Sequence, residues 1–254
     1  MEIRPIEHHE ADEFLHLLCD VFELDFQRAS AVFYTEPFFD LQRKWALLQG
    51  GVIRSILTTT PLHFGWGTAY GIAGVATDRR HRRCGLAGIL LREVMRLADP
   101  EHRPLLFAAD PRLYQSLGFV AIDEVVRGEL NYPTRLDQRE PLPPERVREL
   151  YDRWACEDPE RLIRDDLRWR TWGWSLRCCE PFSSGYLCQE VTVVREAVLP
   201  DPQPYFPVPP STDWVGLRSL TRSLDIPVGT LHAEMFLMGI GWPRPPQMFM
   251  TDQF

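Results

Sequence analysis

The sequence predicts a fold of the α/β (α+β) class, in which helices alternate with antiparallel-looking strands. Apolar residues recur every three or four positions over residues 86–97, as they do in an amphipathic helix. Residues 44–64 hold two β-rich runs that meet at Gly50 and Gly51, which is a hairpin signal. Proline and charged residues dominate residues 131–144. A change of composition of this kind indicates a linker between two folded regions.

The first region, residues 1–130, mixes both kinds of element. In chain order we expect a strand at 2–6, a helix at 9–25, the hairpin at 44–64, a buried strand at 69–77, the helix at 86–97, a strand at 104–109, a short helix at 112–117 and strands within 119–130. Gly118 is the expected C-cap of the short helix. Residues 131–144 then form the predicted linker.

The second region, residues 145–254, has the same mixed character. We expect a helix at 146–158, a tryptophan-rich stretch, strands at 185–191 and 193–199, a proline-rich loop at 200–210, a helix at 215–225 and a strand at 233–239. The last residues are too apolar for a loose tail, so we expect them to be packed.

Composition limits the classes of function. The 254 residues carry a formal net charge of -8, which disfavours a nucleic-acid partner and mildly favours a cationic substrate. No apolar run approaches the roughly 20 residues of a membrane span, and the charged N-terminus is unlike a secretory signal. The six cysteines form no CxxC pair, so we expect reduced thiols in a cytoplasmic protein. The vicinal pair Cys178–Cys179 leaves a redox or metal element open.

Residues 79–91, RRHRRCGLAGILL, concentrate positive charge directly before a predicted helix. A helix N-terminus carries unpaired amide N–H groups and the positive end of the dipole, so it binds anions. Gly85, Ala87 and Gly88 allow close approach, and Arg82 and Arg83 add charge. The order of strand, basic loop, small residues and helix therefore indicates an anion site. A purely structural basic loop and a nucleic-acid patch are the alternatives.

This arrangement resembles the GNAT acyltransferase superfamily, whose signature is [Q/R]-x-x-G-x-[G/A] after a strand. The matching residues are Arg82-Arg83-Cys84-Gly85-Leu86-Ala87. A second element typical of the superfamily, Tyr-x-x-x-Gly-Phe, matches Tyr114, Gly118 and Phe119. The resemblance covers residues 1–130 and implies a mixed central sheet flanked by helices.

Residues 53–91 further resemble the Eis-like branch of that superfamily. Proteins of this branch have a GNAT half, a second degenerate GNAT half and a third, sterol-carrier-like domain. The resemblance implies a catalytic acyl-CoA-binding domain at 1–130 and a second GNAT-like domain at 145–254 that shapes the acceptor site. A chain of 254 residues has no room for the third domain.

The resemblance also implies a cosubstrate and the residues that bind it. Acetyl-CoA is expected as acyl donor, with no metal. Its pantetheine arm would pair with the strand at Val75, Ala76 and Thr77. A backbone N–H there would hold the thioester oxygen as negative charge develops. The pyrophosphate would lie on the basic loop and helix start, residues Arg82, Arg83, Cys84, Gly85, Leu86, Ala87 and Gly88.

Two further residues are candidates for proton transfer. By the resemblance, Tyr114 would be the acid for the leaving thiolate, although a core aromatic beside Phe119 is the alternative. In Eis-like proteins the C-terminal carboxylate enters the active site, so the carboxylate of Phe254 is a candidate base. The side chains of Glu36, His63 and Asp110 remain as other candidates.

The expected function is transfer of an acetyl group from acetyl-CoA to a primary amine, on a small molecule or a peptide. A non-catalytic acyl-CoA-binding module is the alternative. No nucleic-acid or membrane partner is expected, and a homo-oligomer is left open. The tryptophans of the second region, Trp169, Trp172 and Trp174, are candidates to line a cavity for an organic cation or to lie in the core.

Overall fold

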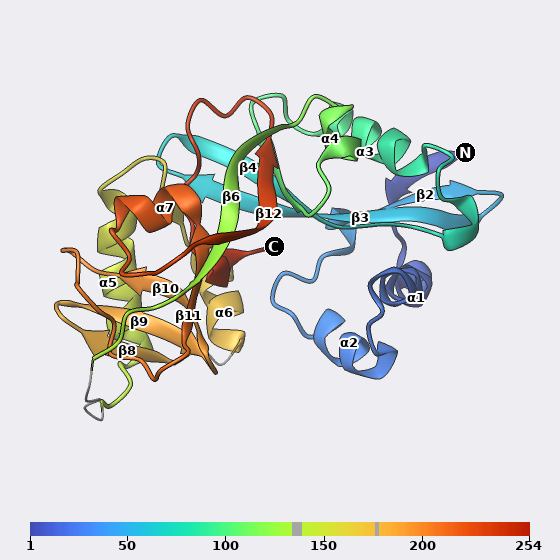
Figure 1. Ribbon diagram of the computed structural model, residues 1–254. Helices are drawn as coiled ribbons and strands as arrows, with labels where there is room; N and C mark the ends of the chain where they lie inside the picture. The colour runs from blue at the N-terminus through green and yellow to red at the C-terminus, as the bar shows by residue number, and fades with distance from the viewer. Residues whose placement is uncertain (134–138, 176–177) are drawn as a thin grey trace.

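The computed structural model describes residues 1–133, 139–175 and 178–254. Within them, twelve strands form one twisted sheet in the order β1-β2-β3-β4-β5-β12-β6-β11-β10-β9-β8, with β7 paired to β3 (Figure 1). The strands are β1 (Glu2–Pro5), β2 (Lys44–Gln49), β3 (Val52–Phe64), β4 (Gly67–Thr77), β5 (Arg103–Ala108), β6 (Val120–Glu129), β7 (Leu162–Ile163), β8 (Cys179–Phe182), β9 (Gly185–Glu190), β10 (Val193–Val198), β11 (Asp213–Leu217) and β12 (His232–Gly239).

The sheet is mixed, as predicted. The pairs β4–β5 and β10–β11 are parallel, and the other neighbours are antiparallel. The hairpin predicted at residues 44–64 is β2 and β3, and Gly50 and Gly51 turn it with φ of +60° and +78°. These positive φ values are strained for residues with a Cβ, which explains the two glycines.

Helices cover both faces of the first half of the sheet, with α3 and α4 on one side and α1 and α2 on the other (Figure 1). Their apolar stripes explain this placement, because α3 packs on Leu57 and Ile72 while α1 packs on Ile53 and Ile56. The helices are α1 (Ala11–Phe22), α2 (Phe26–Phe33), α3 (Leu86–Leu97), α4 (Arg112–Gln115), α5 (Pro144–Cys156), α6 (Asp166–Trp174) and α7 (Arg218–Ser223).

The strand β12 connects the two halves of the chain. It lies between β5 and β6, and pairs antiparallel with both. A strand from the predicted second region therefore completes the sheet of the first region. The division at residues 130 and 145 remains a prediction, and residues 134–138 of the predicted linker lie outside the described residues.

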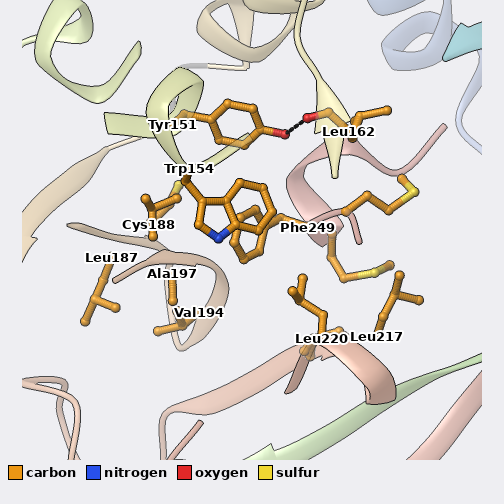
Figure 2. Close-up of a cluster of buried hydrophobic side chains, with 14 of the residues drawn as sticks. Tyr151, Trp154, Leu162, Leu187, Cys188, Val194, Ala197, Leu217, Leu220 and Phe249 are labelled. Carbon is orange, nitrogen blue, oxygen red and sulfur yellow. Dashed lines mark hydrogen bonds between the residues drawn. The ribbon is translucent and has the colours of Figure 1, made fainter. Parts of the chain in front are cut away.

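The largest apolar core lies between the second half of the sheet and α5 (Figure 2). Tyr151, Trp154 and Phe249 are at most 4 % exposed, and the rings of Trp154 and Phe249 lie 4.7 Å apart. The Tyr151 hydroxyl donates a hydrogen bond of 2.9 Å to the carbonyl of Leu162, so the polar end of this ring is satisfied. This core holds the C-terminal segment, which is packed as predicted.

One local prediction needs correction, and two helices were not predicted. Residues 215–217, predicted as the start of a helix, end the strand β11, and α7 begins only at Arg218. Val215 and Leu217 are buried and extend the pairing with β6, so tertiary packing outweighs their helical spacing. The tryptophan-rich stretch forms the helix α6, and a further helix, α2, had no prediction.

All six cysteines are free thiols, and Cys178 is exposed while Cys179 is buried. Among the described residues, no group of three or more His, Cys, Asp or Glu side chains is placed to hold a metal ion. No helix within residues 1–133, 139–175 and 178–254 is long and apolar enough to cross a membrane.

Candidate functional site

The parallel strands β4 and β5 separate part-way along their length. Ala69–Ile72 pair with Arg103–Leu106 and the pairing of the two strands ends there, whereas the other edge of β5 pairs with β12 over Leu105–Ala108. Residues 73–77 of β4 have no strand partner on that side among the described residues. This edge carries backbone donors and acceptors that an extended ligand can pair with. Val75, Ala76 and Thr77, which the resemblance implies as partners of a pantetheine arm, lie on it.

A β-bulge lies at the point of separation. Opposite β3 the register shifts between Ile56 and Thr58, so Gly74 and Val75 together face the single residue Leu57. Gly74 has a φ of +59°, which a side chain would strain. A bulge leaves a backbone group outside the regular ladder, so this segment can offer an N–H to a ligand oxygen.

Asp78 holds the basic loop that follows β4. Its carboxylate accepts the backbone N–H of Arg80 at 3.0 Å and lies 2.9 Å from Nδ1 of His81 and 3.1 Å from the guanidinium of Arg54. The hydrogen bond from the backbone of Arg80, together with the side chains of His81 and Arg54, holds the pKa of Asp78 below its usual range. The loop is therefore ordered by an ionised carboxylate.

The first turn of α3 is open for an anion. Gly85 is its N-cap with a φ of +75°, and no side chain caps the turn. A methyl group on Gly85 would meet no atom within 4 Å, and one on Gly88 would first meet the Arg92 guanidinium at 3.7 Å. Arg82, Arg83 and Cys84 are exposed beside it, whereas the side chain of Leu86 is buried, so Leu86 offers only its backbone amide.

Tyr114 lies on the same face of the sheet as α3. It is half-buried in α4, packs against the cluster that contains Ile72 and Leu86, and meets the ring of Phe119 edge-on at 6.1 Å. Burial raises the pKa of Tyr114 above the ordinary value for a phenol. The phenol is therefore protonated at neutral pH and can donate a hydrogen bond. Its packing against Phe119 means that it is also a core aromatic.

A cavity of about 720 Å³ lies on the opposite face of the sheet. It reaches Ala73 and Gly74 of β4, so it adjoins the bulge. Its walls come from α1, α2 and the loop that follows, from β3, from α6 and from the C-terminal residues 251–254. The helix start, the separated strand and the cavity thus lie in sequence across the sheet, which is an arrangement suited to a two-substrate site.

Phe254 lies where β4 and β5 begin to separate. A methyl group on Gly71 of β4 would come within 2.3 Å of Cδ2 of Phe254, and the ring of Phe107 on β5 lies 5.4 Å from that of Phe254. Phe254 also lines the cavity. The resemblance to Eis-like proteins singled out Phe254, and the absence of a side chain at Gly71 is what lets its ring reach the sheet.

A buried ionic cluster holds the residues just before Phe254. Arg164 is fully buried and binds the carboxylates of Glu196 and Asp252, each at 2.7 Å. Thr251 donates a hydrogen bond to Glu196, and Arg168 lies 3.7 Å from Asp252. The cluster therefore fixes the C-terminal segment at two consecutive residues.

Two tryptophans of the second region, Trp169 and Trp172, pack against this ionic cluster. The Arg164 guanidinium lies 4.8 Å from the ring centre of Trp169 and 5.4 Å from that of Trp172, and the Trp172 indole donates to Glu196 at 3.1 Å. The organic cation beside them is the protein's own arginine. Trp172 also lines the cavity, whereas Trp174 is 40 % exposed.

The three other candidate bases occupy different places. Glu36 lines the cavity and pairs with the buried Lys44 at 3.2 Å. His63 lies 3.3 Å from Asp165 and outside the lining of that cavity. Asp110 pairs with Arg112, whose hydrogen bonds lower the pKa of Asp110 to about 2. A carboxyl group with so low a pKa is a weak base at neutral pH.

Sequence reasoning missed the wall of the cavity made by α2 and the buried cations Lys44 and Arg168. The signal for α2 was present, because Asp25 accepts the backbone N–H of Arg28 at 2.9 Å as an N-cap. Nothing in the sequence indicated that Lys44, which lies within a strand, is 3 % exposed.

Comparison with known proteins agrees with this geometry. The family described as acetyltransferase (GNAT) domain matches residues 2–122. No curated protein matches the sequence. Among solved structures, a GCN5-related N-acetyltransferase from Kribbella flavida is 14% identical with a TM-score of 0.68, over 93% of this chain and 70% of its own.

Two other solved structures share the fold along almost the whole chain. Eis1 from Mycobacterium abscessus is 14% identical with a TM-score of 0.62, over 93% of this chain and 73% of its own. A proposed acetyltransferase from Pyrococcus horikoshii is 12% identical with a TM-score of 0.66, over 98% of this chain and 92% of its own. The predicted likeness to GNAT and Eis proteins is confirmed in the fold.

Proposed function

Residues 2–122 are a GNAT acetyltransferase domain, and from this premise we propose that the protein transfers an acetyl group from acetyl-CoA to a primary amine. The observation that carries the proposal is the separation of β4 from β5. The separated edge has the open α3 N-terminus and Tyr114 on one face of the sheet and the cavity on the other. A donor on the first face and an acceptor on the second would meet at the bulge.

The first face of this site supplies donor binding. The pyrophosphate of acetyl-CoA would lie on the amides of residues 83–88, with Arg82 and Arg83 beside it. The pantetheine arm would pair with the free edge at residues 75–77. The backbone near the bulge would donate an N–H to the thioester oxygen, where negative charge develops as the amine attacks.

Proton transfers complete the exchange. The amine nitrogen forms a bond to the thioester carbon, the carbon–sulfur bond breaks, the thiolate gains a proton and the nitrogen loses one. Tyr114 is the proposed donor toward the thiolate. Because an unperturbed phenol has a pKa of about 10 and a thiol one of about 8.5, full transfer is uphill by about 2 kcal/mol. Burial of Tyr114 raises this cost, so we assign it a hydrogen bond to the sulfur.

The carboxylate that Phe254 carries in this chain is the proposed acceptor of the amine proton. It belongs to a residue that lines the cavity and whose ring packs on β4 at Gly71. Appending three alanines after Phe254 moves the carboxylate while keeping the ring. We expect this variant to bind acetyl-CoA normally and to lose most of its turnover. Unchanged turnover would remove the proposed role of Phe254.

Isothermal titration with acetyl-CoA and CoA tests the donor site. We expect micromolar binding by the wild type and none by the double variant Arg83→Glu, Gly85→Glu. Arg96→Glu is the matched control, because Arg96 is exposed near the other end of α3. Loss of binding in the control, or retained binding in the double variant, would contradict the assignment.

Thiol release on addition of an amine separates the enzyme from its alternative. An acyl-CoA-binding module would hold acetyl-CoA without releasing CoA. The proposed enzyme releases one thiol for each acetylated amine.

A further inference from the structure

We infer that the acceptor is an apolar monoamine, a primary amine on an aliphatic or aromatic body that carries no second charge. This inference rests on the proposed function and names the class of its acceptor. It comes from the chemistry of the walls of the cavity and from the partners of the charged groups in them.

Apolar side chains contribute most of the exposed surface of the cavity, although some of them, such as Phe33 and Trp172, are themselves largely buried. These side chains are contributed by α1, α2, the loop after α2, and α6, and include Leu18, Leu24, Val32, Phe33, Phe38 and Trp172. Leu24 and Val32 are each 49 % exposed, an exposure that offers an apolar surface to a ligand. The volume of about 720 Å³ falls in the range of small-molecule sites.

Each side-chain carboxylate in the walls already has a protein partner or lies at the rim. Glu36 pairs with Lys44 at 3.2 Å, and Asp252 pairs with Arg164 at 2.7 Å. Asp25 caps α2, and the side chain of Glu23 is 85 % exposed with Arg79 at 3.8 Å. Along the lining, no side-chain carboxylate of the described residues is both buried and left for a second ammonium group, and the Phe254 carboxylate is already assigned to the proton of the reacting amine.

The cations of the inner wall are engaged in the same way. Lys44 holds Glu36 and lies 4.3 Å from the ring centre of Phe33. Arg43 lies 3.3 Å from Asp40, and Arg168 donates to the carbonyl of Pro61 at 2.9 Å. An anionic group placed at this inner wall would therefore compete with contacts that the fold already uses; the other lining cation among the described residues, Arg28, is exposed.

The apolar cavity favours the reaction of one amino group of the acceptor but disfavours binding of a second amino group on the same molecule. An apolar wall disfavours the charged form of an amine, so it lowers the pKa of a bound ammonium group and supplies the neutral nucleophile that attack requires. A second ammonium on the same molecule would pay the desolvation cost with no reaction to benefit from it. The cavity thus selects for one amine on an apolar body.

Hexylamine and 1,5-diaminopentane test this selectivity, because both have seven heavy atoms and differ in a terminal methyl or ammonium group. We expect kcat/KM for hexylamine to exceed that for the diamine at least 100-fold, measured by thiol release. Direct titration of both amines into the CoA-loaded protein should show the same preference. Equal or better use of the diamine, or binding of neither amine, would overturn the inference.

The exposed Val32 allows the wall itself to be tested. Val32→Asp adds a carboxylate to the cavity, and Val32→Asn is nearly the same shape without the charge. We expect the ratio of kcat/KM for the diamine to kcat/KM for hexylamine to be at least 10-fold higher in the aspartate variant than in the asparagine variant. An unchanged ratio would count against this cavity as the acceptor site. If acetyl-CoA itself fails to bind, the proposed function fails, while amine titration of the free protein still tests the cavity.

Discussion

Replacing Arg164 by methionine should destabilise the protein strongly, because Arg164 is the centre of its buried ionic cluster. The Arg164 side chain is fully buried and so is that of Glu196, while that of Asp252 is 1% exposed. In Arg164→Met, the cation left beside the two carboxylates among the described residues is Arg168, 3.7 Å from Asp252. One negative charge is then buried without compensation, which costs about 3–5 kcal/mol.

Thermal or urea unfolding followed by circular dichroism measures this loss. At about 2–4 °C per kcal/mol for a chain of this size, we expect the Tm to fall by roughly 6–20 °C. Arg148→Met is the matched control, because Arg148 makes the same kind of ion pair with Asp166 at the exposed surface. That pair is worth about 0–1 kcal/mol, so the control should unfold close to the wild type.

A double-mutant cycle separates charge compensation from loss of packing. In Arg164→Met, Glu196→Gln the uncompensated charge is removed, although the hydrogen bonds that Glu196 accepts from Tyr186 and Trp172 are weakened. We expect the double variant to lose less stability than the sum of the single variants, by about 1–3 kcal/mol. A loss below about 1 kcal/mol for Arg164→Met, or strict additivity in the cycle, would refute the electrostatic reasoning.

Three further results are expected. Gly71→Ala should displace the Phe254 ring, because the new methyl group would come within 2.3 Å of it, and should therefore lower kcat while the affinity for acetyl-CoA is unchanged. Combining it with Phe254→Ala should relieve the clash, measured as a recovery of the Tm in thermal unfolding. No change in either kcat or Tm would argue against the contact. Tyr114→Phe should lower kcat by about 10²-fold, the low end for a general acid, without changing CoA affinity by titration; an unchanged kcat would leave Tyr114 a core aromatic. Burial raises the pKa of Tyr151 and Tyr186. The stability that they contribute is therefore complete below the unfolded phenol pKa of about 10 and is lost as pH rises above it. Absorbance at 295 nm should show these phenols ionising only together with unfolding, and ionisation before unfolding would contradict their burial.

Local sequence patterns predicted the elements of the proposed donor site. The helix α3 spans residues 86–97 as its apolar spacing indicates, and Gly85 precedes it in the left-handed conformation that glycine tolerates. The hairpin at Gly50 and Gly51 follows the same logic. These features depend on residues close together in the chain, so a pattern within about fifteen positions contains the information.

Local sequence patterns could not predict the cavity or the buried ion pairs beside it. Lys44 reads as an ordinary strand lysine, yet the packing of Phe33 and Glu36 around it buries it. Arg164 and Asp252 are 88 positions apart, and only the folded chain shows that they pair.

By itself, the sequence determined the mixed α+β class, the basic loop with its glycine-capped helix and the candidate role of Tyr114. Only the tertiary structure decided that β12 lies between β5 and β6, that β4 leaves β5 after Ile72 and that Phe254 reaches Gly71. The physical reason is the separation along the chain of the residues that interact. Capping, turn and helix preferences act between neighbours along the chain, whereas strand order and charge burial follow from apolar surfaces that meet only after folding.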